Sequence, residues 1–205
     1  KVLVLPDMHL DGAVASMLRS FAASRDLTLV VTEEVKRAFL ESDLDGDDYL
    51  KASLRSHHFR EFRRLKRRLE DQGTLEYRIA RQPDEIRAGV EAFLALEGSG
   101  WKGRERTAMV SDRYQAAFAR EAVHLLAQRD MGRVHLLVLD GKTIASLIVF
   151  IEQGIAYTWK TAYDESYSAY SPGTLLMIEA TKTHLDDPNI MATDSCAAPD
   201  HIVMD

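Results

Sequence analysis

The spacing of apolar positions after residue 73 alternates between the period of a strand and the period of a helix. It predicts, in chain order, a strand, two helices, three strands, a helix and a last strand. The strands are expected at Thr74–Ala80, Val134–Leu139, Thr143–Ile151, Ile155–Tyr163 and Ile190–Thr193. The helices are expected at Pro83–Glu97, from Ser111 to Gln128, and at Pro172–Leu185. This order indicates an α/β (α+β) fold with a mixed central sheet flanked by helices.

The first third of the chain is less regular. Its pattern predicts a short strand at Val2–Leu5, a helix over about residues 12–25 and a strand at Leu27–Thr32. A chain that begins with Lys1 rather than Met is expected to be a fragment or a processed product.

A possible domain boundary follows. The acidic, glycine-containing stretch Glu41–Asp48 is expected to be a loop. One long helix is expected over residues 49–72, ended by Gly73. The chain therefore divides into residues 1–45, a basic connecting helix at 46–73 and a main domain at 74–205.

Composition limits the classes of protein that the chain can represent. Its 205 residues, 46 % of them apolar, suffice to bury roughly 70 % of the unfolded surface. The single cysteine, Cys196, excludes a disulfide framework and a multi-cysteine metal site. A formal net charge of −6 argues against a general nucleic-acid-binding protein. Neither a membrane-spanning run nor a secretory signal is visible, so we expect a cytoplasmic protein.

The most informative stretch lies between the last long strand and the helix that follows it. There Tyr170-Ser-Pro-Gly-Thr174 opens the helix, with Pro172 where no amide is needed. Gly173 permits close approach to the backbone. Free amides at the helix start, together with the Ser171 and Thr174 hydroxyls, suit a phosphate group. The competing interpretation is an ordinary serine-capped helix, which is common in proteins of every function.

Two other segments concentrate cations. Gly98–Arg104 is expected to be a loop in which Trp101 and Lys102 offer a flat face and a charge to a ligand, unless it is only a mobile surface loop. The predicted long helix suits a phosphate, an anionic glycan, RNA or a membrane surface, unless its charges only face solvent. Its cations are Arg55, Arg60, Arg63, Arg64, Lys66, Arg67 and Arg68.

Three motifs occur in a fixed order: Gly100-Trp-Lys-Gly-Arg104, Trp159-Lys-Thr-Ala-Tyr-Asp-Glu165 and Tyr170-Ser-Pro-Gly-Thr-Leu-Leu176. With the basic helix ending at Leu69-Glu-Asp-Gln-Gly73, they resemble the GNAT-related acetyltransferase domain of the CelD proteins, which are linked to cellulose or exopolysaccharide biosynthesis. That family is similar to the FemABX aminoacyltransferases, which carry two GNAT-like halves. The resemblance implies a GNAT-like acyl-CoA N-acyltransferase fold, preceded by the C-terminal part of a first GNAT-like half at residues 1–45.

The resemblance also implies an acyl-CoA-dependent N- or O-acyltransferase. Acetyl-CoA or another acyl-CoA would donate its acyl group to an amine or hydroxyl of a sugar or small metabolite. In GNAT folds the thioester lies between two parted strands, here beside residues 155–163, and the pyrophosphate lies on the start of the next helix. The residues that this implies for cofactor binding are Ser168, Tyr170, Ser171, Gly173 and Thr174. Ser-Pro-Gly replaces the usual Gln/Arg-x-x-Gly-x-Gly/Ala signature, so fewer amides can face the pyrophosphate.

Attack on a thioester needs a proton acceptor for the nucleophile and a proton donor for the leaving thiolate. Asp164 and Asp194, at the ends of two predicted strands, are candidate bases. Tyr163 or Tyr170 is the candidate donor, unless positioning alone supplies the rate and no single base exists. No metal is expected. The residues expected to bind the acceptor are Trp101, Lys102 and Lys160.

Two other functions stay open. The basic helix would also suit a FemABX-like aminoacyl transferase that uses charged tRNA, although a small-molecule or glycan acceptor is the favoured partner. The missing glycine-rich signature would suit a non-catalytic scaffold in a polysaccharide-synthesis assembly.

Overall fold

The computed structural model describes residues 2–6 and 8–197. Contacts group the chain into two units, residues 1–36 and 37–205, which are described separately. The helices are α1 (Ala13–Ser24), α2 (Gly46–Ser53), α3 (Ser56–Glu70), α4 (Pro83–Ser99), α5 (Trp101–Arg104), η1 (Met109–Ser111), α6 (Arg113–Ala127), η2 (Glu165–Tyr170) and α7 (Pro172–Asp186). The strands are β1 (Phe39–Leu40), β2 (Leu75–Ala80), β3 (Gly132–Leu139), β4 (Lys142–Glu152), β5 (Ile155–Tyr163) and β6 (Ala192–Asp194).

The second unit contains a mixed sheet with the strand order β1-β6-β5-β4-β3-β2. All neighbouring strands are antiparallel except β5 and β6, which are parallel. The prediction of a mixed sheet flanked by helices is therefore confirmed. The last strand begins two residues later than expected, at Ala192.

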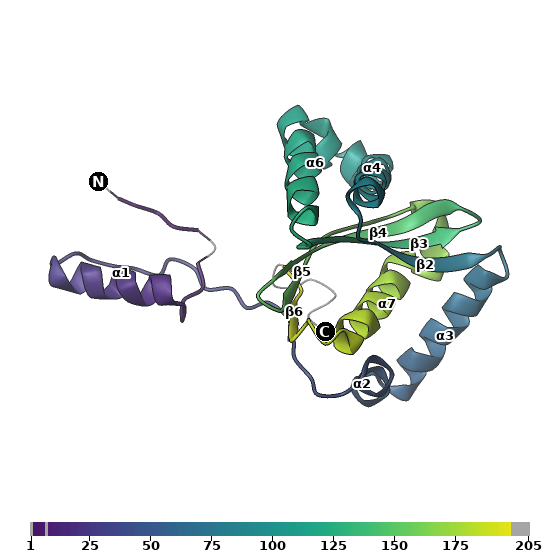
Figure 1. Cartoon of the computed structure of the whole chain (residues 1–205), viewed down its shortest axis with the longest axis horizontal. Helices are drawn as coiled ribbons and strands as arrows, with labels where there is room; N and C mark the ends of the chain where they lie inside the picture. Colours follow the sequence, from purple (N-terminus) through teal and green to yellow (C-terminus); the bar gives the residue numbers. More distant parts are fainter. Residues whose placement is uncertain (1, 7, 198–205) are drawn as a thin grey trace. The chain divides into compact units, whose positions relative to one another are not determined.

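Helices cover both faces of this sheet (Figure 1). On one face α4 and α6 pack against β3, β4 and β5, with Phe93 and Val123 fully buried. On the other face α7 packs against β3, β4 and β5, and Leu69 of α3 joins the same buried cluster as Leu176 of α7. Because β3 and β4 are covered on both sides, their sequences are nearly continuous apolar runs rather than alternating ones.

The two strands predicted before residue 36 are wrong. Only α1 forms in the first unit, and Val2–Leu5 and Leu27–Thr32 have no strand structure. A strand needs a neighbour for its backbone hydrogen bonds, and no neighbouring strand is present in the part of this unit that the structure describes. High β propensity was therefore not sufficient.

The single helix predicted over residues 49–72 is also wrong, because it consists of α2 and α3. The backbone is extended at Leu54 (ψ 132°) and Arg55 (ψ 140°), which breaks the helix. The break lets two short helices bury different faces: Leu50 of α2 is buried, and α2 packs against α7, while Leu65 and Leu69 of α3 are buried and Leu69 joins a core cluster with residues of the sheet.

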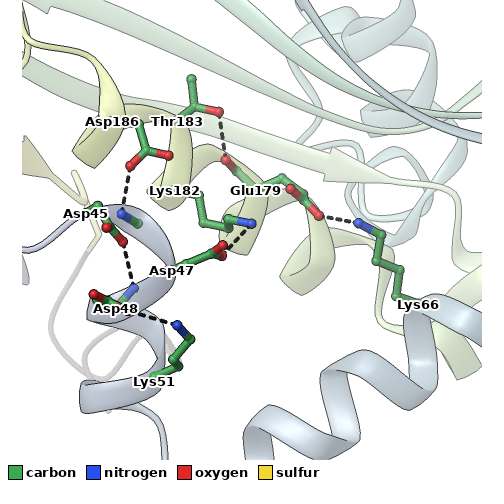
Figure 2. A network of polar contacts seen from close by, with 10 residues as sticks. Asp45, Asp47, Asp48, Lys51, Lys66, Glu179, Lys182, Thr183 and Asp186 are labelled. Atoms are coloured by element: carbon green, nitrogen blue, oxygen red, sulfur yellow. Dashed lines mark hydrogen bonds and ion pairs between the residues drawn. The ribbon is translucent and has the colours of Figure 1, made fainter.

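A hydrogen bond and an ion pair hold α2 against the C-terminal part of α7 (Figure 2). The backbone amide of Gly46 donates to the carboxylate of Asp186 at 2.8 Å, and Lys182 pairs with Asp47 at 2.7 Å. The helices touch so closely that a Cβ on Gly46 would lie 2.6 Å from the Cα of Lys182. No helix in the described part of the chain has both the length and the apolar composition of a membrane span.

The expected loop at 98–104 is wrong as well, because α4 continues to Ser99 and α5 follows. Glu165 accepts hydrogen bonds from the Trp101 amide (2.6 Å) and from Arg104 (2.8 Å). The buried carboxylate of Glu97 accepts from the Lys102 ammonium and the Met109 amide. These two carboxylates order a segment that glycine content alone assigns to a loop.

Candidate functional site

β6 is short and pairs with only the start of β5. β5 pairs with β4 from Ile155 to Tyr163, but only its first three residues, Ile155 to Tyr157, pair with β6. Beyond Tyr157, the edge of β5 has no strand partner on that side among the described residues. β6 ends at Asp194, opposite Tyr157, and the unpaired edge of β5 continues toward Tyr163 and the start of α7; we call this unpaired edge, together with the end of β6, the V.

Local features of β5 set the point of separation. The register with β4 shifts between Ile148 and Val149, so Trp159 is an extra residue in β5. Such a bulge bends a strand and increases its twist. One residue earlier, the Thr158 hydroxyl lies 3.2 Å and 2.9 Å from the carbonyl oxygens of Asp194 and Ser195. The bulge and this hydroxyl fix the closed end of the V.

The helix that starts at the open end has free amide donors. Ser171 precedes α7 in the left-handed region (φ 48°) and its side chain makes no capping hydrogen bond. The Leu175 amide donates to the Ser171 carbonyl, whereas the described contacts give the amides of Gly173 and Thr174 no acceptor. Pro172 has no amide to satisfy. The first turn of α7 is thus available to an anion.

Aromatic side chains surround this turn. A Cβ on Gly173 would lie 3.3 Å from the ring of Tyr163, so glycine permits that ring to lie against the backbone. The ring of Tyr170 lies 5.2 Å from the guanidinium of Arg68 on α3. The carbonyl of Ser168 accepts the Ser171 amide at 3.0 Å. The structure thus brings the five residues predicted to bind the cofactor together with Tyr163 and adds Arg68.

Asp164 is held by several donors. Its carboxylate accepts from the Lys142 ammonium at 2.7 Å and from the Ser166 amide and hydroxyl at 3.0 Å and 2.6 Å. Burial raises the pKa of this carboxyl, but the donors from Lys142 and Ser166 outweigh it and hold the pKa below its ordinary value. A carboxylate with a lowered pKa is a weaker base, so this environment suits positioning better than proton abstraction.

A pocket of about 620 Å³ lies beside Asp164, on the face of the sheet covered by α4. One wall consists of small side chains of α4, including Ala92 and Ala95, and the other contains Lys142, Asp164 and Glu165. Its size is in the range of small-molecule sites. It is a candidate acceptor pocket adjoining the end of β5.

Asp194 lies at the other end of the V. It is opposite Tyr157, six residues before Tyr163 on β5, which corresponds to about 20 Å along a strand. Its carboxylate pairs with Arg37 at 3.0 Å and accepts the Cys196 amide at 2.8 Å. The two predicted acids are therefore not brought together.

The residues predicted to bind the acceptor are dispersed. The ring of Trp101 is half exposed, and Lys102 is paired with the buried Glu97. Lys160 lies on β5 next to the bulge, with its ammonium 6.0 Å from the ring of Trp159. Of the three, only Trp101 contacts the pocket wall directly, because its backbone amide donates a hydrogen bond to Glu165.

Three residues of this region were not predicted from the sequence: Lys142, Thr158 and Glu165; Arg68 was expected as one of the phosphate-binding cations of the basic helix. Each acts through a partner distant in the chain, as when Glu165 binds Trp101 across 64 positions. The glycine turn before Lys142 could have placed that lysine near the end of β5, because it indicates a hairpin. Thr158 and Glu165 carry no local sequence signal that would have marked them as site residues.

Comparison with known proteins supplies independent information. A family model described as acetyltransferase (GNAT) domain matches residues 56–188. No curated protein matches the chain. FemX is similar in fold, with a TM-score of 0.57 and 11 % identity over 95 % of this chain and 63 % of FemX. 

Two other solved structures are similar over a smaller part of the chain. A possible acetyltransferase from Clostridium difficile 630 has a TM-score of 0.49 and 15 % identity over 63 % of this chain and 84 % of its own. The PaiA N-acetyltransferase from Thermoplasma acidophilum, solved with coenzyme A, has a TM-score of 0.37 and 16 % identity over 53 % of this chain and 71 % of its own.

Proposed function

The chain belongs to the acetyltransferase (GNAT) domain family, and from that premise we propose that it moves an acyl group from acyl-CoA to an amine or hydroxyl. Acetyl is the expected group, and a sugar or small metabolite is the expected acceptor. The observation that carries the proposal is the V, the edge of β5 left unpaired beyond the end of β6, which leads to free amides at the start of α7. A thioester arm can lie in the V while its phosphates meet that helix start.

The proposed donor site uses the first turn of α7. The amides of Gly173 and Thr174 would bind phosphate oxygens, and the hydroxyls of Ser171 and Thr174 could add donors. Tyr170 would flank the phosphates together with Arg68. Ser168 contributes by holding the Ser171 amide, which fixes the turn.

The proposed chemistry relies on positioning more than on a strong base. The nucleophile attacks the thioester carbonyl, the C–S bond breaks, and the nucleophile's proton ends on the departing thiol. Tyr163, at the open end of the V, is proposed to donate to that thiolate. Asp164 is proposed to orient the acceptor with Lys142 and to accept a proton weakly, because its pKa is lowered. Asp194 stays a candidate base at the closed end.

The acceptor is proposed to enter the pocket between α4 and the end of β5. Its neutral ion pair Lys142–Asp164 and its small apolar wall suit an uncharged sugar or amine of modest size. Trp101 would cover a sugar face, and Lys160 or Lys102 would attract an acidic group. A role in cellulose or exopolysaccharide biosynthesis, as in CelD-like proteins, is part of this proposal.

Binding of acetyl-CoA to the full chain tests the donor site. Acetyl-CoA at millimolar concentration is expected to raise the melting temperature by several degrees, as ligand linkage requires. Gly173→Glu should abolish that shift, because the new carboxylate repels phosphate and displaces the Tyr163 ring. The measurement is a thermal unfolding scan with and without the ligand.

Gln128→Glu is the matched control, since it adds the same charge directly after α6, on the opposite face of the sheet. This variant should keep the full ligand shift. An unchanged shift in Gly173→Glu would remove the proposed donor site. Failure of the wild-type chain to consume acetyl-CoA with a panel of amines and hydroxyl compounds would favour a scaffold instead.

A FemABX-like aminoacyl transfer from charged tRNA is the second candidate. The exposed arginines of α3 support it, because they would bind a phosphate backbone. Salt-dependent tRNA binding that disappears when Arg63, Arg64, Arg67 and Arg68 are neutralised would favour this candidate. Absence of tRNA binding at low salt would remove it.

A further inference from the structure

The outer face of α3 is strongly cationic. The helix contains six Lys or Arg residues and two Glu residues, whereas the whole chain has a net charge of −6. Arg64 pairs with Glu61 and Lys66 pairs with Glu179. Arg60, Arg63, Arg67 and Arg68 are exposed and form no ion pair among the described residues. We call these four residues the α3 arginine face.

The apolar side of α3 is already occupied. Leu65 and Leu69 are buried, and Phe62 packs against the cluster that contains Leu176 of α7. Insertion of α3 into a lipid surface would need these side chains, so a membrane does not fit. The arginine face is left to a hydrophilic, anionic partner.

The arginine face adjoins the proposed donor site. Arg68, in its last turn, lies over the ring of Tyr170, and Ser171 and the free amides follow within a few residues. Lys66 reaches Glu179 in the middle of α7, so α3 lies alongside that helix (Figure 2). From Arg60 to Arg68 the face extends about 12 Å along the helix axis. A partner bound here would sit at the mouth of the V.

The start of α7 offers few donors for phosphate oxygens. Pro172 has no amide, and the Ser171 and Leu175 amides donate to backbone carbonyls. The amides of Gly173 and Thr174 are the free donors of this turn in the described structure. Two amides suit one phosphodiester, whereas free CoA brings a diphosphate and a further 3′-phosphate. The same acyl thioester also occurs on a protein-bound phosphopantetheine arm, which has a single phosphodiester.

We infer that the α3 arginine face docks a small acidic carrier protein, whose phosphopantetheine arm delivers the acyl thioester into the V. The inference rests on the proposed acyl transfer and names its donor partner. In the step, the acceptor's N or O bonds to the carbonyl carbon, the C–S bond breaks and the acceptor's proton passes to the carrier thiol. CoA contains the same arm and is expected to bind beside Arg68 without using Arg60, Arg63 or Arg67.

Charge distribution favours a carrier protein over RNA. A long polyanion would extend beyond the arginine face onto a chain whose net charge is negative, which opposes binding. A short acidic helix of a carrier protein can pair with the arginine face without extending over the rest of the chain. Such contacts would steer association and would weaken steeply with salt.

The test measures binding of the full chain to three probes: a purified acidic acyl carrier protein with its phosphopantetheine arm, CoA, and an RNA hairpin. The triple variant Arg60→Glu, Arg63→Glu and Arg67→Glu is expected to weaken carrier-protein binding by at least about tenfold. CoA binding should change by less than about twofold, since these residues do not contact the α7 turn. Carrier-protein binding should also fall as salt rises from about 0.05 M to about 0.3 M.

The matched control makes the same charge change on other exposed arginines: Arg87→Glu, Arg113→Glu and Arg129→Glu. It should bind carrier protein like the wild type, which excludes an effect of net charge alone. CoA binding without carrier-protein binding, or RNA binding tighter than carrier-protein binding, overturns the inference and leaves the acyl-transfer proposal standing. Binding of neither CoA nor carrier protein overturns both. A triple variant that still binds CoA is folded, so its loss of carrier-protein binding is evidence that the arginine face is the docking surface.

Discussion

At the scale of single residues, a buried polar cluster lies between α7 and strands β2, β3 and β6. The Tyr77 hydroxyl lies 2.6 Å from Nδ1 of His135 and 3.1 Å from the Thr183 hydroxyl. His184 bonds through Nδ1 to Thr193 at 3.1 Å, and its buried Nε2 has no partner among the residues that the structure describes. Burial lowers the pKa of His184 to about 4 and that of His135 well below its ordinary value. Both imidazoles are therefore kept neutral in the folded chain.

This cluster predicts a loss of stability on acidification. Between pH 6.5 and pH 4 the unfolded chain binds a proton at His184 that the folded chain does not, so the unfolding free energy falls as pH falls. The loss attributable to His184 is about 3 kcal/mol across that window and levels off below it. Urea denaturation of the wild type and of His184→Leu at several pH values measures it.

The unfolding free energy of His184→Leu should depend less steeply on pH than that of the wild type between pH 6.5 and pH 4. Some dependence should remain, because His135 is also kept neutral in the folded chain. His57→Asn, on the exposed surface of α3, serves as the control and should leave the dependence unchanged. Equal slopes for wild type and His184→Leu would show that the imidazole is not kept neutral by the fold.

At the scale of elements, α7 organises the second unit. Its N-terminus lies beside the V, near Tyr163. Glu179 in its middle forms an ion pair with Lys66 of α3, and Asp186 at its C-terminal end accepts a hydrogen bond from the Gly46 amide of α2. The absence of a side chain at Gly46 lets α2 approach the backbone of α7 at Lys182. Figure 2 shows the ion pair of Lys182 with Asp47 beside this contact. The position of the donor site therefore depends on packing at both ends of one helix.

Replacement of Gly46 tests this packing. A side chain there would collide with the backbone of Lys182, so Gly46→Val should reduce the unfolding free energy by about 2 kcal/mol. Ser53→Ala, an exposed position on the same helix, should change it by less than about 0.5 kcal/mol. Urea denaturation distinguishes the two; similar values for both variants would contradict a close α2–α7 contact.

At the scale of the whole molecule, the two units differ in how much core they possess. Both buried clusters lie entirely in residues 37–197, from Leu69 to Ala180 and from Ala80 to Ala162. The first unit buries Ala15 and Ala22, while Met17 and Phe21 of α1 are exposed. A helix of 12 residues without a packed face is marginal in water. Stability therefore resides in the second unit.

Deletion of residues 1–36 should leave the melting temperature of the remaining chain within about 3 °C of the original, because neither core cluster loses a member. The acetyl-CoA shift should persist as well, since the residues of the V and of α7 are retained. A cooperative transition that disappears after deletion would show that the first unit supplies essential core.

Much of residues 74–194 could be predicted from the sequence. The strands and helices there were located to within a few residues, because apolar periodicity is a local property of the chain. Boundaries were less exact: Asp112 rather than Ser111 caps α6. The expected strand at Leu27–Thr32 failed because a strand depends on a partner that propensity does not specify. The association with acetyltransferases is confirmed, while the CelD-like subfamily stays a prediction.

By itself, then, the sequence determined the layered fold, the motif at the start of α7 and the family. The tertiary structure alone decided that β6 pairs with β5 only up to Tyr157, that Lys142 restrains Asp164 and that Arg68 meets Tyr170. The physical reason is distance along the chain. Periodicity and turn chemistry act among neighbouring residues, whereas each of these contacts joins segments 22 or more positions apart and exists only after the layers pack.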